Sequence, residues 1–135
     1  MLSTETPMTA QFYDLDPMNV VWHGNYARYL EQARCDLLDA LGYNYTEMGA
    51  SGYAWPIVDL RLKYVRPIRF GQTIVVTATL VEYQNRLKID YRIRDRDSGE
   101  VLTKASTIQV AVALSSGEMQ LESPAALTER VEALA

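Results

Sequence analysis

One stretch of this 135-residue chain, residues 25–41, has the apolar spacing of a long amphipathic helix. Apolar side chains recur there every three or four residues, so they fall along one stripe of a helix, opposite the polar side chains. Gly42 follows the last apolar position and is predicted to end the helix, and Asn25 or a residue just before it is predicted to cap its start. The residues of the apolar stripe are Tyr26, Tyr29, Leu30, Ala33, Leu37 and Leu41.

The rest of the chain is dominated by patterns that are typical of β-strands. Residues 86–96 alternate between apolar and charged side chains, and residues 72–83 are rich in β-branched residues. After a loop at 42–52, the chain continues with further strands, and the order is one strand, the long helix and four strands in an antiparallel meander. Strands are predicted at 8–15, 53–70, 72–83, 86–96 and 100–114, hairpin turns at 84–85 and 97–99, and a short last helix after Ser123-Pro124.

One helix cannot cover both faces of such a sheet. It must pack across one face, and the other face is then solvated or pairs with a second subunit. The predicted fold class is therefore α+β, with one long central helix wrapped by an antiparallel β-sheet, which is the arrangement of the hotdog fold. The chain is predicted to be a single domain over residues 1–135, with its core roughly within residues 8–121.

Composition and charge argue against several classes of function. The formal net charge of −4 argues against a general role in binding nucleic acid, because phosphate contacts need a basic surface. Cys35 is the only cysteine, so an intrachain disulfide is excluded and a reducing compartment is favoured. No apolar run approaches the roughly 18 residues of a membrane span, and the N-terminal residues lack the pattern of a secretory signal. A cytoplasmic protein with no membrane partner is predicted.

Two carboxylates and the only histidine stand directly before the predicted helix, in the stretch DLDPMNVVWHGNYARYLEQAR (14–34). A helix N-terminus presents backbone N–H groups without partners, so it can polarise a carbonyl whose oxygen becomes negative in a transition state. Asp16 ends the predicted first strand, where its carboxylate can lie opposite the helix start and act as a nucleophile or general base. Gly24 lacks a side chain and would let a ligand approach the backbone closely.

Each of these residues also has a structural interpretation. Asp-x-Asp-Pro is typical of a turn, and a histidine at a helix start is more often a hydrogen-bonding residue than a catalyst. Glu31 and Arg34 have the spacing of an ion pair on a helix surface. Spacing alone therefore leaves open whether Asp14, Asp16 and His23 form a site.

The same segment resembles the opening motif of the acyl-CoA thioesterases of the hotdog superfamily, in the branch that contains 4-hydroxybenzoyl-CoA thioesterase and YbgC. That motif has an aromatic residue and two aspartates, then two valines, an aromatic residue and a histidine, and then a helix with tyrosines, a glutamate and an Ala-Arg pair. The stretch DLRLKYVRPIRFGQTIVV (59–76) resembles a later segment of the family. The matching residues of the first motif are Tyr13, Asp14, Asp16, Val20, Val21, Trp22, His23, Tyr26, Tyr29, Glu31, Ala33 and Arg34.

The resemblance implies a thioesterase that hydrolyses an acyl-CoA or acyl-carrier-protein thioester without a metal or an organic cofactor. It implies that Asp16 attacks the thioester carbonyl or activates water, and that the backbone amide of His23 polarises this carbonyl. The imidazole of His23 would line the site or orient substrate or water. Gly24 and Tyr26 are predicted to contact the substrate, and Asp14 to support the loop through hydrogen bonds to the backbone.

Coenzyme A carries phosphates, so a local basic patch is expected on this acidic chain. Arg66, Arg69, Arg86 and Lys88 are the candidates. The family places its phosphate contacts around the predicted hairpin at 84–85, which favours Arg86 and then Lys88. Family sites form between subunits, which implies a homodimer or a tetramer of paired dimers.

Two other functions share these features. A hotdog hydratase or dehydratase would use His23 and a carboxylate as an acid–base pair. A protein that only binds acyl-CoA would hold the same ligand and release no thiol. Product chemistry distinguishes the three functions, because thioester hydrolysis releases free thiol and hydration changes the absorbance of an enoyl group.

Overall fold

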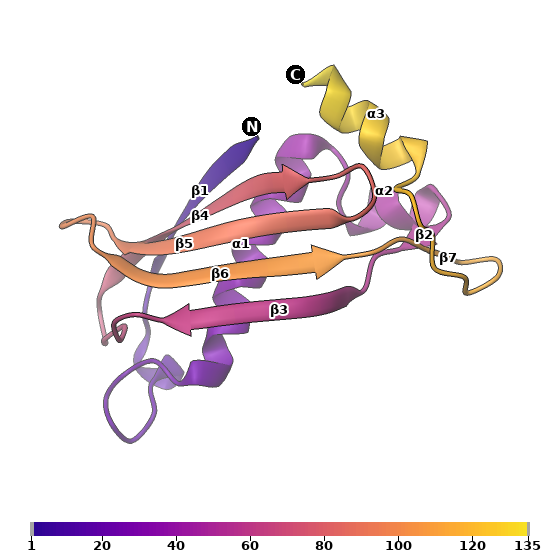
Figure 1. Cartoon of the computed structure of the whole chain (residues 1–135). Helices are drawn as coiled ribbons and strands as arrows, with labels where there is room; N and C mark the ends of the chain where they lie inside the picture. Colours follow the sequence, from indigo (N-terminus) through magenta and orange to yellow (C-terminus); the bar gives the residue numbers. More distant parts are fainter. Residues whose placement is uncertain (1, 135) are drawn as a thin grey trace.

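The computed structural model describes residues 2–134 and places one long helix across an antiparallel five-stranded sheet (Figure 1). Helix α1 lies behind the sheet in this view and packs against β1 and β4, so the predicted α+β arrangement is confirmed. The elements are, in chain order, β1 (Ser3–Thr9), η1 (Phe12–Asp14), η2 (His23–Asn25), α1 (Tyr26–Leu41), α2 (Tyr45–Ala50), β2 (Tyr53–Ala54), β3 (Ile57–Tyr64), β4 (Thr73–Glu82), β5 (Leu87–Asp95), β6 (Val101–Gln109), β7 (Val112–Ala113) and α3 (Ala125–Ala133).

The strands of the large sheet lie in the order β1-β4-β5-β6-β3, and each neighbouring pair is antiparallel. The predicted meander is correct for β4, β5 and β6, but wrong for the strand before them, because β3 pairs with β6 and not with β4. β4 has no free edge for β3, since β1 occupies that edge from Ser3 opposite Thr79 to Thr9 opposite Thr73. β3 is left as an edge strand of the sheet.

Helix α1 has the buried stripe that its spacing predicts, and all six stripe residues are buried. The 3₁₀ turn η2 precedes the helix and continues directly into it. The helix ends at Gly42, as predicted, and the backbone of Gly42 has a φ of 74°, in the left-handed region that glycine adopts without strain. The N–H of Gly42 donates to the carbonyl oxygens of Asp39 and Leu38 and so completes the last turn.

Two predicted boundaries before β3 are wrong for local reasons. The first strand is β1, and not residues 8–15, because residues 12–14 form the 3₁₀ turn η1 ahead of the Asp16-Pro17 break. The segment predicted as a loop at 42–52 contains α2. This short helix starts with a capping box, in which Asn44 and Glu47 satisfy each other's backbone N–H groups.

Proline and the second, smaller sheet explain the other differences. The strand predicted at 53–70 is divided at Pro56 into β2 and β3, because proline has no N–H for a ladder, and β3 ends before Pro67. The strand predicted at 100–114 is divided into β6 and β7, and β7 pairs with β2. The last helix is present as α3. No helix among residues 2–134 has both the length and the apolar character that crossing a bilayer requires.

The two faces of the large sheet differ in chemistry, as the alternation in β5 predicts. Side chains on one face are buried under α1 and its neighbours, and the alternate side chains lie on the opposite, outer face and are partly exposed. The buried set of β5 is Leu87, Ile89, Tyr91 and Ile93, and the outer set is Lys88, Asp90, Arg92 and Arg94.

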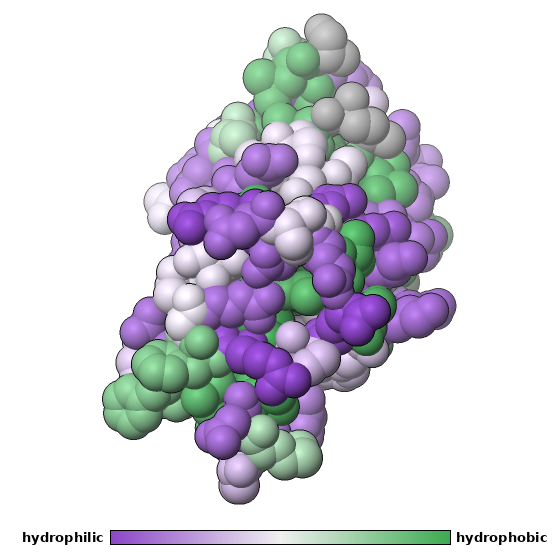
Figure 2. Space-filling model, turned by 90° about the vertical axis from the view of Figure 1, so that its left-hand side faces the viewer, coloured by the Kyte–Doolittle hydropathy of each residue, from purple (hydrophilic) through white to green (hydrophobic). Residues whose placement is uncertain are grey.

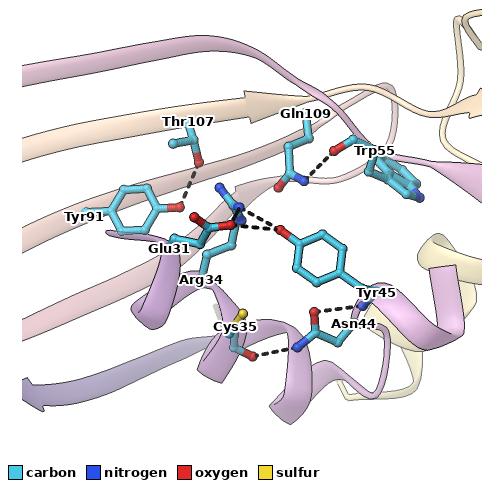
Figure 3. A network of polar contacts seen from close by, with 9 residues as sticks. All are labelled: Glu31, Arg34, Cys35, Asn44, Tyr45, Trp55, Tyr91, Thr107 and Gln109. Carbon is cyan, nitrogen blue, oxygen red and sulfur yellow. Dashed lines mark hydrogen bonds and ion pairs between the residues drawn. The ribbon is translucent and has the colours of Figure 1, made fainter. Parts of the chain in front are cut away.

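A buried arginine of α1 lies between the helix and the sheet (Figure 3). The Arg34 side chain is 4% exposed, donates from Nη2 to the hydroxyl of Tyr45 (2.8 Å) and lies 3.3 Å from the Glu31 carboxylate. The predicted pair of Glu31 and Arg34 is confirmed, but Arg34 is not on the helix surface. Burial by itself lowers the pKa of the Arg34 guanidinium. The hydrogen bond with Tyr45, together with the charge interactions with Tyr45, Tyr91 and Glu31, outweighs this effect, so the net pKa is raised.

Candidate functional site

Asp14 fixes the segment before α1 onto the helix. Its Oδ2 accepts hydrogen bonds from the backbone N–H of Gln11 (3.0 Å) and from the hydroxyl of Tyr29 (2.9 Å). Its carbonyl oxygen accepts hydrogen bonds from the N–H of Trp22 (2.9 Å) and from the side chain of Asn25 (2.8 Å). Asp14 is 3% exposed, so it supports the loop, as predicted, from inside the protein.

Asp16 begins a tight turn that holds its carboxylate in place. The N–H of Asp16 donates to the carbonyl of Val20 (2.9 Å), and its carbonyl accepts from the N–H of Asn19 (3.0 Å). Asn19 has a φ of 62°, a left-handed conformation that asparagine tolerates better than most residues. Oδ1 of Asp16 accepts from the N–H of Met18 (2.8 Å), whereas Oδ2 has no hydrogen-bond partner within residues 2–134. The turn therefore fixes one carboxylate oxygen and leaves the other free.

His23 and Gly24 form the first helical turn before α1. The first amides of a helix have no partner within the helix, and the N–H groups of His23 and Gly24 are in that position. The indole of Trp22 lies over Gly24, so that a Cβ at Gly24 would collide with the ring. Trp22 thus fills the space that the missing side chain leaves, and its ring centroid lies 5.3 Å from that of His23. A ligand can reach Gly24 from that side only if Trp22 moves.

The Asp16 turn, the start of α1 and the end of β3 together form an open cleft of about 290 Å³. Three of the predicted site residues, Asp16, His23 and Tyr26, line it. Figure 2 shows apolar residues gathered at the lower end of the molecule, where Figure 1 places the segment between β1 and α1. The structure therefore brings the predicted acid and the helix start into one partly apolar cleft. The other lining residues are Met18, Val20, Val21, Tyr64, Val65, Arg66 and Pro67.

Tyr64, the last residue of β3, is a lining residue that the sequence did not identify. Its hydroxyl donates to the carbonyl oxygen of His23 (3.3 Å), and its ring meets that of Tyr26 edge-on, with the ring centroids 4.8 Å apart. Tyr26 is 2% exposed, and burial raises the pKa of its phenol. In the sequence, Tyr64 could be located only in the stretch 59–76. That location does not reveal which residues its ring contacts.

The predicted phosphate contacts lie at two ends of the sheet. Arg66 lines the cleft, whereas Arg86 and Lys88 lie in the β4–β5 hairpin and at the start of β5. Ile93, five residues after Lys88, is level with Tyr64 at the cleft. At about 3.4 Å per residue, Lys88 is therefore roughly 17 Å from the level of the cleft along the strand. Within one chain, the structure does not bring Arg86 and Lys88 together with Asp16.

Arg69 lies outside the cleft, in the connection between β3 and β4, where its N–H donates to the side chain of Gln72 (3.0 Å). No three His, Cys, Asp or Glu side chains within the described part of the chain lie close enough together to hold a metal ion.

A profile of the thioesterase-like superfamily matches residues 10–131. The chain belongs to this superfamily. YneP of Bacillus subtilis, provisionally named an acyl-CoA thioesterase, is 30% identical over 103 residues, which are 76% of this chain and 74% of that protein. The chloroplast acyl-acyl carrier protein thioesterase ATL3 of Arabidopsis thaliana is 34% identical over 76 residues, 56% of this chain and 40% of ATL3. The structure of DHNA-CoA thioesterase from Staphylococcus aureus is 29% identical, with a TM-score of 0.80 over 88% of this chain and 80% of that one.

Membership of the thioesterase-like superfamily confirms both the family resemblance and the prediction of a thioester hydrolase. The matched residues begin before the Asp16 turn and include α1 and β3 through β7. The cleft therefore lies entirely within the part of the chain that this thioesterase shares with its superfamily.

Proposed function

We propose that this thioesterase hydrolyses an acyl-CoA or acyl-carrier-protein thioester in the cleft between the Asp16 turn and the start of α1. The observation that carries the proposal is that a fixed carboxylate and His23, whose N–H is unpaired at the helix start, line one open cleft. The names of the relatives, one an acyl-CoA and one an acyl-carrier-protein thioesterase, support this class of substrate.

Asp16 supplies the reacting carboxylate. Its free Oδ2 attacks the carbonyl carbon and expels the thiolate, which takes a proton from solvent, and water then hydrolyses the acyl-enzyme anhydride. Alternatively, Oδ2 takes a proton from a water that attacks the same carbon, and this proton passes to the departing thiolate. The N–H of His23, which lines the cleft, donates to the carbonyl oxygen as it becomes negative, and one such donor is typically worth about 2.7–4 kcal/mol. The imidazole of His23 lines the cleft and orients substrate or water.

Replacing Asp16 with asparagine tests this role. Asparagine keeps the size of the side chain and can still accept from the N–H of Met18, but it neither attacks a thioester nor takes a proton. We expect the best acyl-CoA substrate in a thiol-release screen to be hydrolysed at least about 100-fold more slowly. The far-UV circular dichroism spectrum and the oligomeric state should not change.

Asp97→Asn, in the exposed turn between β5 and β6, is the matched control and should keep full activity. Unchanged thiol release by Asp16→Asn would refute the role of Asp16. An enoyl absorbance change without free thiol would instead identify a hydratase or dehydratase. Stable binding of acyl-CoA for hours without thiol release would identify a binding protein.

We also propose that the active unit contains a homodimer that forms through β3. This edge strand exposes apolar side chains together with an unpaired backbone edge, which is a template for pairing with another strand. The opposite edge strand, β1, contains Glu5 and Pro7, and charge and proline both discourage such pairing. The exposed apolar residues in and directly after β3 are Ile57, Val58, Leu60, Tyr64 and Val65.

An antiparallel pair of β3 strands from two copies would bring Arg86 and Lys88 of one copy to the end of the dimer where the cleft of the other copy lies. Antiparallel pairing places the Ile57 end of one strand beside the Tyr64 end of the other, so the two sheets run in opposite directions. The β4–β5 hairpin of a second copy, with its Arg86 and Lys88, then lies at the same end of the dimer as the cleft of the first copy. The predicted phosphate contacts would come from that second copy.

A further inference from the structure

The outer face of the sheet carries a cluster of cations that the proposed reaction does not use. A shallow depression of about 330 Å³ lies across β3, β6 and β5 on this face. Four basic side chains line it, and Asp90 is the acidic residue in the lining. The chain as a whole has a net charge of −4, so its general composition does not account for this basic surface. The four cations are Arg61, Lys63, Arg92 and Lys104.

Three of these cations stand directly opposite one another on neighbouring strands. Lys63 of β3 is opposite Lys104 of β6, and Lys104 is opposite Arg92 of β5, so the three form a basic row across the sheet. The Cβ atoms of such neighbours are about 4.5–5.5 Å apart, and like charges at this distance destabilise the sheet. None of the three forms an ion pair within residues 2–134, whereas Arg61 pairs with Asp59. The basic row therefore has no ion-pair partner among the described residues, although Asp90 lies in the same depression.

The position of the basic row limits what can supply a counter-charge. The same face of a second copy would repel it, because both faces carry the same cations. The depression is shallow and spans three strands, which suits the surface of another protein better than a small anion. The row and the cleft lie on opposite faces of β3 at consecutive residues, since Lys63 is on the outer face and the next residue, Tyr64, lines the cleft.

We propose that the basic row docks the acidic surface of an acyl carrier protein and so selects carrier-bound thioesters over acyl-CoA. This inference rests on the proposed function, and it assigns the partner of the same site. Complementary charge at such a surface mainly speeds encounter and fixes orientation, so the effect should weaken as salt is added. The carrier's flexible thioester arm then enters the cleft beside the end of β3.

Lys104→Glu is the most informative variant, because Lys104 stands in the middle of the row. The matched control is Arg96→Glu, which makes the same change in net charge in the exposed turn after β5. The substrates are an acidic bacterial acyl carrier protein and coenzyme A, both loaded with the acyl group that gives the fastest thiol release. We expect Lys104→Glu to raise KM for the acyl carrier protein roughly tenfold and to leave KM for acyl-CoA unchanged. Arg96→Glu should change neither value.

The midpoint of thermal unfolding shows whether a raised KM of Lys104→Glu comes from misfolding or from lost docking. This midpoint should equal or exceed that of the wild type, because the substitution places an anion between two cations. The Kd of the acyl carrier protein, measured by fluorescence anisotropy without turnover, should rise in parallel with KM. This Kd tests the docking surface even if neither thioester releases thiol, a result that would count against the proposed function alone.

Three results would overturn the docking proposal. Unchanged KM and Kd for the carrier protein in Lys104→Glu would show that the row does not contact it. Equal increases in KM for the carrier protein and for acyl-CoA would show that the row binds the phosphates of coenzyme A. Binding to duplex DNA or to phosphatidylglycerol vesicles that depends on Lys104, without carrier-protein binding, would show a different anionic partner.

Discussion

Tyr64 connects the edge strand β3 to the helix start that the proposed reaction uses. Its hydroxyl donates to the carbonyl oxygen of His23, and its ring packs edge-on against Tyr26. These contacts hold the end of β3 against the turn at the helix start. Tyr64 is 48% exposed and phenylalanine keeps its ring, so Tyr64→Phe removes the hydrogen bond to His23 with little loss of buried apolar surface.

We expect Tyr64→Phe to lower kcat roughly two- to tenfold, because a neutral hydrogen bond is worth about 0.5–1.5 kcal/mol and the phenyl ring keeps its contact with Tyr26. KM should change less, since the lost bond does not itself bind substrate and positions the helix start that we propose polarises the carbonyl. Steady-state thiol release and a thermal melt check this result. Tyr13→Phe is the control, because Tyr13 is 67% exposed and lies outside the cleft. The positioning role fails if Tyr64→Phe keeps the wild-type kcat.

At the scale of single residues, the sequence predicted cleft residues from the segment before α1, but not the residues that complete the walls of the cleft. Asp16, His23 and Tyr26 lie within one short segment, where a turn and a helix period determine how they meet. Tyr64 comes from a strand 41 residues after His23, and nothing in the local pattern of that strand identifies the contact. Trp22 over Gly24 is a similar case, since only the folded chain shows the ring position.

At the scale of elements, the segment between β1 and α1 depends on the contact between Asp14 and Tyr29. Burial, reinforced by the hydrogen bond to the Asp14 carboxylate, raises the pKa of Tyr29 well above its usual range. The phenol therefore stays protonated and donates to Asp14, which also accepts the N–H of Gln11. This contact fixes the 3₁₀ turn η1 on the first turns of the helix.

We expect Tyr29→Phe to lower the free energy of unfolding at pH 7 by about 1.5–3 kcal/mol, because the Asp14 carboxylate loses a donor. The stability of the wild type should also fall above about pH 10, where the unfolded chain releases the Tyr29 proton and the folded chain retains it. Tyr29→Phe removes this contribution, so its stability should fall less steeply with pH in that range. Urea unfolding at a series of pH values measures both effects.

Tyr13→Phe provides the reference at pH 7, since the Tyr13 side chain is exposed, and its free energy of unfolding should stay within about 0.5 kcal/mol of the wild type. Identical slopes of stability against pH above about pH 10 for Tyr29→Phe and the wild type would contradict the raised pKa of Tyr29.

Side-chain periods predicted the long elements, but they did not predict strand order. Helix α1 and strand β5 each have one buried side with a regular period, so their type and orientation follow from the pattern. β3 is exposed on both faces, and its pattern cannot show that its neighbour is β6 rather than β4. The short elements η1 and α2 depend on individual capping contacts, and they are too short to show a helical period in the sequence.

At the scale of the whole molecule, β3 contributes to the cleft, to the basic row and to an unpaired edge of the sheet. Its last residue lines the cleft, its outer face carries Lys63 of the basic row, and its edge has no partner among the described strands. Helix α1 packs against β1 and β4 and leaves the apolar residues of β3 uncovered. A second copy on this edge would cover those residues and would also bring its Arg86 and Lys88 to the cleft.

We expect the protein to elute as a dimer or a larger even-numbered oligomer in size-exclusion chromatography with light scattering, and Leu60→Lys to elute as a monomer. Leu60 is 44% exposed on the helix-facing side of β3, so a lysine there places a charge inside the proposed apolar contact. Leu121→Lys makes the same change at a residue that is 81% exposed and outside β3, and it should leave the oligomer intact. Because the phosphate contacts would be lost with the second copy, KM for acyl-CoA should rise in Leu60→Lys. A monomeric wild type, or a dimeric Leu60→Lys with unchanged KM, would exclude the dimer through β3.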